Sequence, residues 1–410
     1  MSAHGPRRVL LYAHDTYGLG HLRRNLAIAR RLLEDRPRMR IVLASGSPVL
    51  SSFSLPRGLS VVALPPVEKV GAEEYQPLDR RLDIDLVRRA RSAVIADVAR
   101  RFAPDVFLVD HAPHGMKGEL LPVFDVLQRW CPATRIVLGL RDVLDDPGVV
   151  RQLWQEQGVY ETLKMVYDRI LVYGSADVFD VRREYAMPPP VAARTSFCGY
   201  LCPASLRAVP TPELAPDGPF VLGTAGGGGD GLAVLTATLA ASRELGVGCL
   251  LVTGPLMAPA QRRRLVELAA NVPGASVVEF VPDLADVMAG ARAVVTMGGY
   301  NSLCELVGLR APTVVVPRVS PRREQAIRAE LFASRGLVRV ALPGLGLAER
   351  LARELSQAIA SPERKPVHLD LGGLSRLAGL LEGEAAGAGS GIGVAPWVRQ
   401  RRIPEERVSA

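Results

Sequence analysis

The sequence predicts two consecutive doubly wound α/β domains, and three observations support this prediction. Short apolar segments alternate with amphipathic helical segments along the chain, which is the pattern of βαβ units on a parallel sheet. A proline-rich stretch interrupts this alternation, which then starts again. The length of 410 residues also exceeds that of one ordinary domain core. We therefore expect a first domain over residues 1–205, a linker over 206–219, a second domain over 220–383 and a flexible Gly- and Ala-rich tail over 384–410.

The expected strands are short and apolar, and the clearest helices space their apolar residues at intervals of 3.6. In the first half, strands are expected at 9–13, 41–44, 61–64, 106–109, 136–140, 170–172 and 195–198, with helices at 22–33 and 82–102. In the second half, strands are expected at 220–224, 249–252, 277–280, 293–297, 313–316 and 338–341, with a helix at 232–245.

Composition narrows the class of protein. Hydrophobic residues make up 48% of the chain and charged residues 22%, which is typical of a soluble globular protein. No apolar stretch is long enough to span a bilayer, and the N-terminus lacks a signal-peptide core, so we expect a cytoplasmic location. Five scattered cysteines indicate reduced thiols, and Cys198 and Cys202 lack the second pair that a zinc site needs.

The net charge is +8 and the pI is about 9.5. Because the arginines alternate with acidic residues along the helices, we interpret this excess as compositional and do not expect a nucleic-acid partner. The basic charge is compatible with peripheral association with an anionic membrane surface.

In an open parallel sheet, ligands bind beyond the carboxyl ends of the strands. After the first expected strand, Gly18 and Gly20 open a turn and His21 begins a helix. A neutral imidazole at a positive helix end could take a proton from a hydroxyl group. His21 could equally only cap the helix, and the spacing alone leaves both readings open.

Further polar residues follow the strands expected at 106–109 and 136–140, at the same edge of the first sheet. They are Asp110, His111 and His114 after the first of these strands, and Arg141 and Asp142 after the second. They could bind an acceptor or orient the base. Asp142, Asp145 and Asp146 could also cap the next helix, an interpretation that we favour for Asp145 and Asp146.

The second domain contains two candidate nucleotide-binding segments. The first is a glycine run after strand 220–224 that includes Gly226, Gly227 and Gly228, where bare N–H groups could approach a diphosphate. It is neither a Walker loop nor a dinucleotide fingerprint. The second is the segment 291–339, which offers N–H groups, a carboxylate and guanidinium groups suited to phosphates and ribose. Its candidate residues are Gly298, Gly299, Glu305, Arg318, Arg322, Glu324 and Gln325.

This second segment resembles the C-terminal donor domain of family 28-type GT-B glycosyltransferases. The strings EFVPDLADVM, GGYNSLCE and RREQ carry the resemblance, and YGLGHLRRNLAIARRL looks like the N-terminal glycine-rich loop of the same superfamily. Together the matching segments occur in both domains and in the expected order. The loop YGLGH and the run AGGGGDG differ from the strings of the best-known members, so the acceptor is not assigned from the resemblance.

The resemblance implies a GT-B fold, with two Rossmann-like domains facing across a cleft, and a hexosyltransferase-type reaction. An acceptor hydroxyl would attack the anomeric carbon of a nucleoside-diphosphate sugar, with inversion and without a metal or other cofactor. On the acceptor side, the resemblance makes His21 the leading candidate for the base or for an acceptor-loop residue. Asp110 and His111, which follow a strand, are the other catalytic candidates, and Gly18, Gly20, Arg141 and Asp142 are expected nearby.

For the donor, the resemblance implies that Phe280 and Val281 flank the base, that Gly298, Gly299 and Asn301 lie near the diphosphate, that Glu305 binds ribose and that Glu324 and Gln325 bind the sugar. Arg318, Arg322 or Arg323 would stabilise the leaving diphosphate. Two alternatives stay open: a nucleotide-sugar hydrolase or epimerase on the same fold, and a non-catalytic nucleotide-sugar-binding protein.

Overall fold

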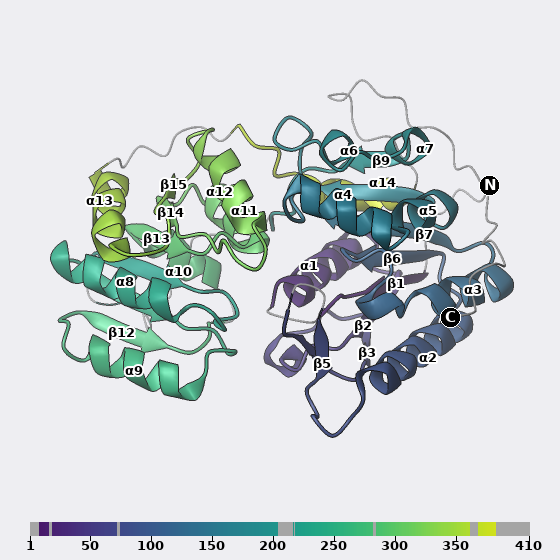
Figure 1. Ribbon diagram of the computed structural model, residues 1–410, viewed down its shortest axis with the longest axis horizontal. Coiled ribbons are helices and arrows are strands. Elements are labelled where there is room, and N and C mark those ends of the chain that lie inside the picture. Colours follow the sequence, from purple (N-terminus) through teal and green to yellow (C-terminus); the bar gives the residue numbers. More distant parts are fainter. Residues whose placement is uncertain are drawn as a thin grey trace. The chain divides into compact units, whose positions relative to one another are not determined.

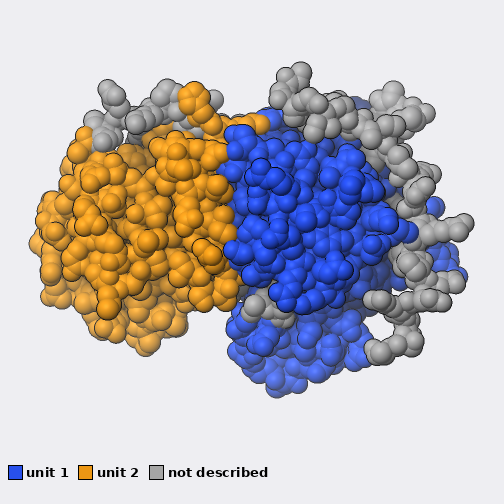
Figure 2. Space-filling view, turned by 45° about the horizontal axis from the view of Figure 1, so that its top comes forward, with its two compact units in different colours: residues 1–16, 21–201, 372–410 blue, residues 17–20, 202–371 orange. Residues whose placement is uncertain are grey.

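The computed structural model describes residues 8–15, 19–71, 74–203, 216, 218–281, 284–360 and 368–382. The chain divides into two compact units, which Figure 2 distinguishes by colour. Unit 1 comprises residues 1–16, 21–201 and 372–410, and unit 2 comprises residues 17–20 and 202–371. Each unit is built around one parallel sheet (Figure 1).

Within the described residues, unit 1 contains a sheet of seven parallel strands in the order β3-β2-β1-β6-β7-β8-β9. The strands are β1 (Arg8–Tyr12), β2 (Arg40–Ser45), β3 (Leu59–Ala63), β6 (Val106–Asp110), β7 (Arg135–Arg141), β8 (Arg169–Tyr173) and β9 (Thr195–Phe197). All seven were predicted from their apolar sequences. The chain order reverses between β1 and β6, which pair in register with Tyr12 beside Val109. A doubly wound sheet binds its ligands at such a switch point.

The helices of unit 1 fill the connections between these strands. They are α1 (Gly20–Asp35), α2 (Ile84–Phe102), α3 (Leu121–Trp130), α4 (Pro147–Glu156), α5 (Val159–Met165), α6 (Val181–Glu184) and α7 (Pro189–Ala192), with short 3₁₀ turns at Leu50–Ser52 and Met116–Gly118. Asp83 caps α2 by accepting the N–H groups of Asp85 and Leu86. A small antiparallel hairpin of β4 (Val67–Lys69) and β5 (Tyr75–Pro77) was not predicted, because its strands are only three residues long.

The last described helix, α14 (Gly373–Glu382), belongs to unit 1, whereas we expected the second domain to continue to residue 383. Arginines from unit 1 bind its C-terminal end. Arg169 donates to the Leu380 carbonyl oxygen at 2.8 Å, and Arg36 forms an ion pair with Glu382 at 3.0 Å. Cationic groups at a helix C-terminus satisfy exposed carbonyls and oppose the negative end of the helix dipole.

Unit 2 contains a sheet of six parallel strands in its described part, in the order β12-β11-β10-β13-β14-β15. The strands are β10 (Phe220–Thr224), β11 (Gly248–Val252), β12 (Ala275–Val278), β13 (Ala293–Thr296), β14 (Thr313–Val315) and β15 (Arg339–Val340). The helices are α8 (Leu232–Glu244), α9 (Pro259–Ala269), α10 (Leu284–Gly290), α11 (Tyr300–Gly308), α12 (Glu324–Ala333) and α13 (Leu347–Ala360). The switch point lies between β10 and β13, where Thr224 pairs with Thr296.

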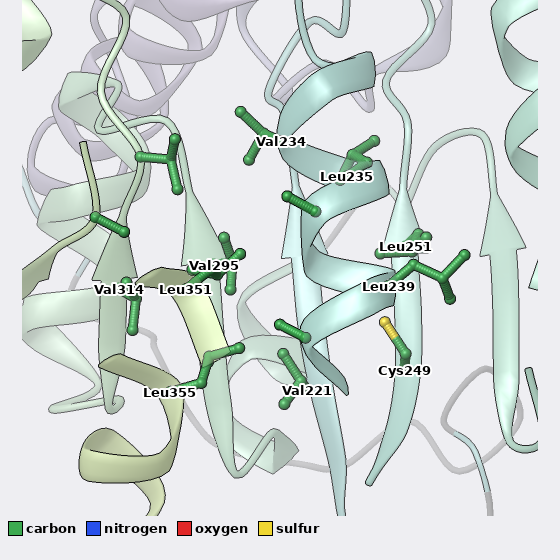
Figure 3. Packing of buried hydrophobic residues seen from close by; sticks show 14 of the residues in the cluster. Val221, Val234, Leu235, Leu239, Cys249, Leu251, Val295, Val314, Leu351 and Leu355 are labelled. Carbon is green, nitrogen blue, oxygen red and sulfur yellow. The ribbon is translucent and has the colours of Figure 1, made fainter. Parts of the chain in front are cut away.

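Alternation along the strands of unit 2 buries both faces of the sheet. On β10, Val221 joins an apolar cluster that includes residues of α8, α9 and α13, while Leu222 joins the cluster beneath α10 and α11. Figure 3 shows the first cluster, in which Leu235 and Leu239 of α8 lie over the sheet. Burial on both faces explains why these strands are continuous apolar runs.

The predicted strands of unit 2 are all present, but β12 lies two residues earlier than expected. It ends at Val278, so Phe280 follows the strand and does not belong to it. Most of the expected linker at 206–219 and the whole tail at 384–410 lie outside the described residues.

Candidate functional site

The switch point of unit 1 gathers ionisable side chains from three segments. His14 and Asp15 follow β1, Asp110 ends β6 and is followed by His111, and His21 is the second residue of α1. Asp110 is fully buried. A buried carboxylate needs hydrogen-bonding partners, because it has lost its hydration.

His21 and Asp110 form a short hydrogen bond, which is the central contact of this site. The distance from His21 Nδ1 to Asp110 Oδ2 is 2.6 Å, and the His21 side chain is 14% exposed. Because an ionised carboxylate can only accept, Nδ1 carries the proton and donates it. The described part of the chain provides no hydrogen-bond partner for Nε2, so this atom keeps an acceptor lone pair.

Arg24, one turn after His21 on α1, binds the same carboxylate. Its Nε donates to Asp110 Oδ1 at 2.9 Å and its Nη2 donates to Oδ2 at 2.8 Å. Burial alone would raise the pKa of Asp110, but the charges and hydrogen bonds of Arg24 and His21 hold it well below its usual range. Asp110 is therefore ionised at all physiological pH values.

The imidazole of His21 is neutral near pH 7. The pKa of His21 is lowered to about 4, chiefly by burial and in smaller part by Arg24 and Arg141, while Asp110 acts in the opposite direction. A neutral imidazole with a protonated Nδ1 can accept a proton at Nε2. From the spacing alone, His21 could be either a helix cap or a general base. Its hydrogen bond from Nδ1 to Asp110 gives the ring the orientation that a general base requires.

Two further imidazoles surround His21. Its ring centroid lies 5.2 Å from that of His111 and 5.7 Å from that of His14. His111 has a left-handed backbone, with φ of +71°, and its Nε2 lies 3.5 Å from Arg141 Nη2. The structure therefore brings the predicted residues His21, Asp110, His111 and Arg141 together.

A buried ion pair of Arg91 and Glu119 lies next to this group and is linked to His14 by the Tyr12 hydroxyl. The side chains of Arg91 and Glu119 are both fully buried, with Arg91 Nε 2.6 Å from Glu119 Oε2 and Nη2 2.9 Å from Oε1. The hydroxyl of Tyr12 donates to Glu119 Oε1 at 2.6 Å and lies 3.3 Å from His14 Nδ1. This network could not be predicted from the sequence, because its members are separated by 28 and 107 positions.

Asp15 is a second buried acid at the end of β1, and our sequence interpretation missed it. Its Oδ2 accepts the hydroxyl of Ser45 at 2.6 Å, while no described group donates to its Oδ1. The pKa of Asp15 is raised to about 6, chiefly by burial and in smaller part by the neighbouring Asp110, while the hydrogen bond from Ser45 acts in the opposite direction. Its position directly after a strand was the one available signal.

The other residues expected on the acceptor side have different contacts. His114 binds the hydroxyl of Thr162 at 2.7 Å, away from the histidine cluster. Asp142 is buried, and Asp146 caps α4 through the Gly148 N–H, which confirms the capping interpretation of Asp146. Gly20 is the first residue of α1, and Gly18 lies outside the described residues.

In unit 2, the glycine run lies at the switch point between β10 and α8. Gly228 has φ of +95°, and a Cβ placed there would overlap the carbonyl oxygen of Thr253. Gly254 faces the carbonyls of Gly226 and Gly227 in the same way. The glycine run therefore allows two connecting loops to pack backbone to backbone, whether or not it binds phosphate.

Arg318 connects three parts of the second candidate site. Its Nη2 lies 3.2 Å from Glu324 Oε1, its Nη1 lies 3.5 Å from Asp230 Oδ2, and its backbone N–H donates to Gln325 Oε1 at 3.0 Å. The Nε of Arg318 is buried and has no partner among the described residues. Arg318 and Glu324 were predicted, whereas Asp230 was not.

Arg328 completes this group from the next turn of α12. It is fully buried, donates to the Gly298 carbonyl oxygen at 3.2 Å and lies 3.7 Å from Glu324 Oε2. Our sequence interpretation missed Arg328, although its position four residues after Glu324 places both on one helix face. The structure thus brings Gly298, Arg318, Glu324 and Gln325 together.

The remaining donor-side residues lie nearby in the chain but have separate surroundings. Gly299 is the N-cap residue of α11, and Asn301 lies in its first turn. Glu305 is buried on α11 and influences Cys202, whose pKa is raised to about 12 by burial and by this carboxylate. Val281 packs in the apolar cluster beneath α10, while Phe280 and Arg322 are half-buried.

No group of three or more His, Cys, Asp or Glu residues in the described ranges is arranged to hold a metal ion. Among the described helices, none is both long enough and apolar enough to cross a bilayer.

Comparison with known proteins identifies the class of fold. The chain is similar to the calicheamicin glycosyltransferase CalG4, with a TM-score of 0.55 and 18% identity over 92% of this chain and 98% of that one. It is also similar to a putative UDP-N-acetylglucosamine 2-epimerase from Listeria monocytogenes, with a TM-score of 0.60 and 14% identity over 93% of this chain and 98% of that one. Together with the two parallel sheets, these similarities show the GT-B fold and confirm the predicted fold class.

The sequence comparison is more specific. Residues 244–367 match the glycosyltransferase family 28 C-terminal domain. The UDP-N-acetylglucosamine--N-acetylmuramyl-(pentapeptide) pyrophosphoryl-undecaprenol N-acetylglucosamine transferase of Methylobacterium sp. (strain 4-46) is 32% identical over 178 residues, which are 40% of this chain and 45% of that protein. The chain thus matches less than half the length of this relative. The match to the family 28 C-terminal domain lies within the second unit, where the resemblance placed it.

Proposed function

We propose that this protein is a glycosyltransferase that moves a sugar from a nucleoside-diphosphate sugar to a hydroxylated acceptor. One observation carries the proposal: a hydrogen-bonded His–Asp pair lies at the switch point of unit 1, in a chain whose unit 2 carries a family 28 domain. The first feature suits activation of a hydroxyl nucleophile, and the second suits a nucleotide-sugar donor.

In the proposed reaction, His21 Nε2 takes the proton of the acceptor hydroxyl as its oxygen attacks the anomeric carbon. Asp110 holds the imidazole through Nδ1 and stabilises the positive charge that forms on it. The bond from the anomeric carbon to the diphosphate breaks on the opposite side, so the configuration inverts. In this scheme no metal ion takes part.

We further propose that unit 2 binds the donor. The N–H groups at the start of α11, after Gly298 and Gly299, and the guanidinium of Arg318 would stabilise the leaving diphosphate. The buried Nε of Arg318, which lacks a partner among the described residues, supports this role. Glu305 would accept ribose hydroxyls, and Gln325 would contact the sugar.

The first test is binding of UDP, TDP and GDP, measured by thermal shift and by calorimetry. We expect at least one of them to raise the melting temperature. Glu305→Ala should weaken that nucleotide by about 1–3 kcal/mol, or roughly 5- to 150-fold, because hydrogen bonds to a charged group are lost. Glu267→Ala, an exposed acid on α9, is the matched control and should bind normally. If all three nucleotides leave the melting temperature unchanged, the proposal fails.

The second test follows once a donor and an acceptor are found. His21→Gln and Asp110→Asn should each lower the transfer rate by about 10²- to 10⁴-fold, the usual contribution of a general base. The exposed His368 is the control, and His368→Gln should transfer normally. Full turnover in His21→Gln would remove the catalytic assignment.

A second candidate is a nucleotide-sugar hydrolase or epimerase, which the similarity of fold to the Listeria epimerase favours. Incubation of the protein with a donor and no acceptor separates the two. Stoichiometric release of free sugar, or an epimerised nucleotide sugar, would support this candidate and contradict transfer. Nucleotide binding without turnover of any donor would instead support a non-catalytic binding protein.

A further inference from the structure

Arg24 is a buried cation directly beside the His21–Asp110 pair. It is 3% exposed and donates to both oxygens of Asp110, at 2.9 Å and 2.8 Å. Two parallel N–H bonds from one planar guanidinium fix the orientation of a carboxylate, which a single bond from lysine does not do.

The three residues are held by regular structure. His21 and Arg24 are three positions apart on α1, so they lie on one face of the helix, and Asp110 ends the central strand β6. Beyond the guanidinium, the ring centroid of Tyr173 lies 6.0 Å from Arg24 Cζ. The guanidinium is thus enclosed between Asp110 and an aromatic side chain of β8.

The hydrogen bonds to Asp110 determine which ring nitrogen of His21 is protonated. Arg24 Nε occupies Oδ1, while Arg24 Nη2 and His21 Nδ1 both lie within hydrogen-bond distance of Oδ2. Arg24 Nη2 also lies 2.9 Å from His21 Nδ1, and arginine has only donors to offer. Only one arrangement satisfies the carboxylate fully: both donors point to Asp110, and Nδ1 is protonated.

We propose that Arg24 is a positioning residue for the proposed transfer reaction: by clamping both oxygens of Asp110, it fixes His21 as the Nδ1–H tautomer and directs the Nε2 lone pair to the acceptor hydroxyl. This inference rests on the proposed function for its catalytic meaning. The structural part of the inference, that Arg24 fixes the tautomer of His21, can be tested without substrates.

Electrostatics gives the proposal a second consequence. In the described part of the chain, the charged and titratable groups that interact with His21 are Asp110 of β6, Arg24 of α1, Arg141 of β7, and His14 and His111 after β1 and β6. Arg24 neutralises Asp110, so the carboxylate stabilises an imidazolium less than it would in an isolated pair. The lowered pKa of His21 agrees with this arrangement, although burial is its largest cause.

The test is NMR of protein labelled with ¹⁵N in its histidine rings, in the absence of nucleotide. Arg24→Gln removes both the charge and the paired N–H donors of the guanidinium, whereas Arg24→Lys keeps the charge alone. Arg30→Gln, which changes an exposed arginine on the same helix, is the control. Comparison with His21→Gln assigns the His21 signals among the six histidines of the chain.

We expect wild type and Arg30→Gln to show His21 as the neutral Nδ1–H tautomer from pH 8 down to pH 5. Arg24→Gln should mix the two tautomers and move the titration midpoint of His21 upward by at least one pH unit. Arg24→Lys should mix the tautomers with a smaller shift of the midpoint. With a known substrate pair, both variants should lower kcat and leave the donor KM unchanged.

If Arg24→Gln keeps the tautomer and the midpoint of wild type, the proposal is wrong. If Arg24→Gln does not fold, Arg24→Lys decides, and a wild-type tautomer signal in that variant also overturns the proposal. A wild-type protein that binds no nucleotide contradicts the proposed function, while the NMR comparison still shows whether Arg24 controls His21.

Discussion

Removal of the Arg91 guanidinium should destabilise unit 1 strongly. Arg91 and Glu119 are both fully buried and share two hydrogen bonds, and Arg91 Nη1 also donates to the Pro65 carbonyl oxygen at 2.9 Å. In Arg91→Met, the Glu119 carboxylate stays buried, and among the described residues only the Tyr12 hydroxyl remains as a donor, at 2.6 Å. Loss of one partner from a buried pair costs about 3–5 kcal/mol, so we expect that loss in the free energy of unfolding.

Urea unfolding followed by tryptophan fluorescence measures this effect. Trp130 and Trp154 belong to unit 1, and residues 202–371 of unit 2 contain no tryptophan, so the signal of these two side chains reports unit 1. Trp154 is 5% exposed, so its emission should shift on unfolding. The midpoint and slope of the transition give the free energy by linear extrapolation.

Two controls make the result decisive. Asp97→Ala breaks the ion pair with Arg101, whose side chains are 75% and 48% exposed for Arg101 and Asp97, and should cost less than about 1 kcal/mol. The double variant Arg91→Met/Glu119→Leu removes both charges. Its loss in the free energy of unfolding should be clearly smaller than the summed losses of Arg91→Met and Glu119→Leu. A cost for Arg91→Met as small as that of Asp97→Ala, or additive losses in the double variant, would refute the reasoning.

Two further predictions concern stability. The pKa of Asp15 is about 6 in the folded state, against an ordinary value of 3.8, so ionisation of this carboxyl destabilises the fold as the pH rises through this window. Asp15→Asn should therefore stabilise unit 1 by up to about 3 kcal/mol at pH 8 and by about half of that at pH 5, and a gain in urea unfolding that does not depend on pH would contradict the prediction. In unit 2, Gly228→Ala should lower the calorimetric melting temperature more than Gly226→Ala, because only the first Cβ overlaps a carbonyl oxygen, that of Thr253. Gly226→Ala should cost only the strain of its positive φ, about 1–2 kcal/mol, and equal losses in the two variants would show that loop packing is not the cause.

The strand pattern could be predicted because each strand of a doubly wound sheet is buried on both faces and therefore appears as a short apolar run. The same reasoning placed Asp110 and His111 correctly at a strand end. It missed the hairpin β4–β5, because strands of three residues are too short to show a period. It also placed α14 in the second domain, which was expected to end at residue 383, whereas α14 belongs to unit 1. The Arg36–Glu382 and Arg169–Leu380 contacts that hold α14 join residues hundreds of positions apart.

By itself, the sequence determined the fold class, the resemblance to family 28 in the second half, and which residue types follow each strand. These properties depend on local composition and on periodicity, which are written along the chain. The tertiary structure alone decided which of these residues meet. It joined His21 to Asp110 across 89 positions and added Arg24, Arg91, Glu119 and Arg328, none of which the sequence had singled out. A buried charge is tolerated only where the fold supplies a partner, and that partner is set by strand order and packing, which local sequence does not encode.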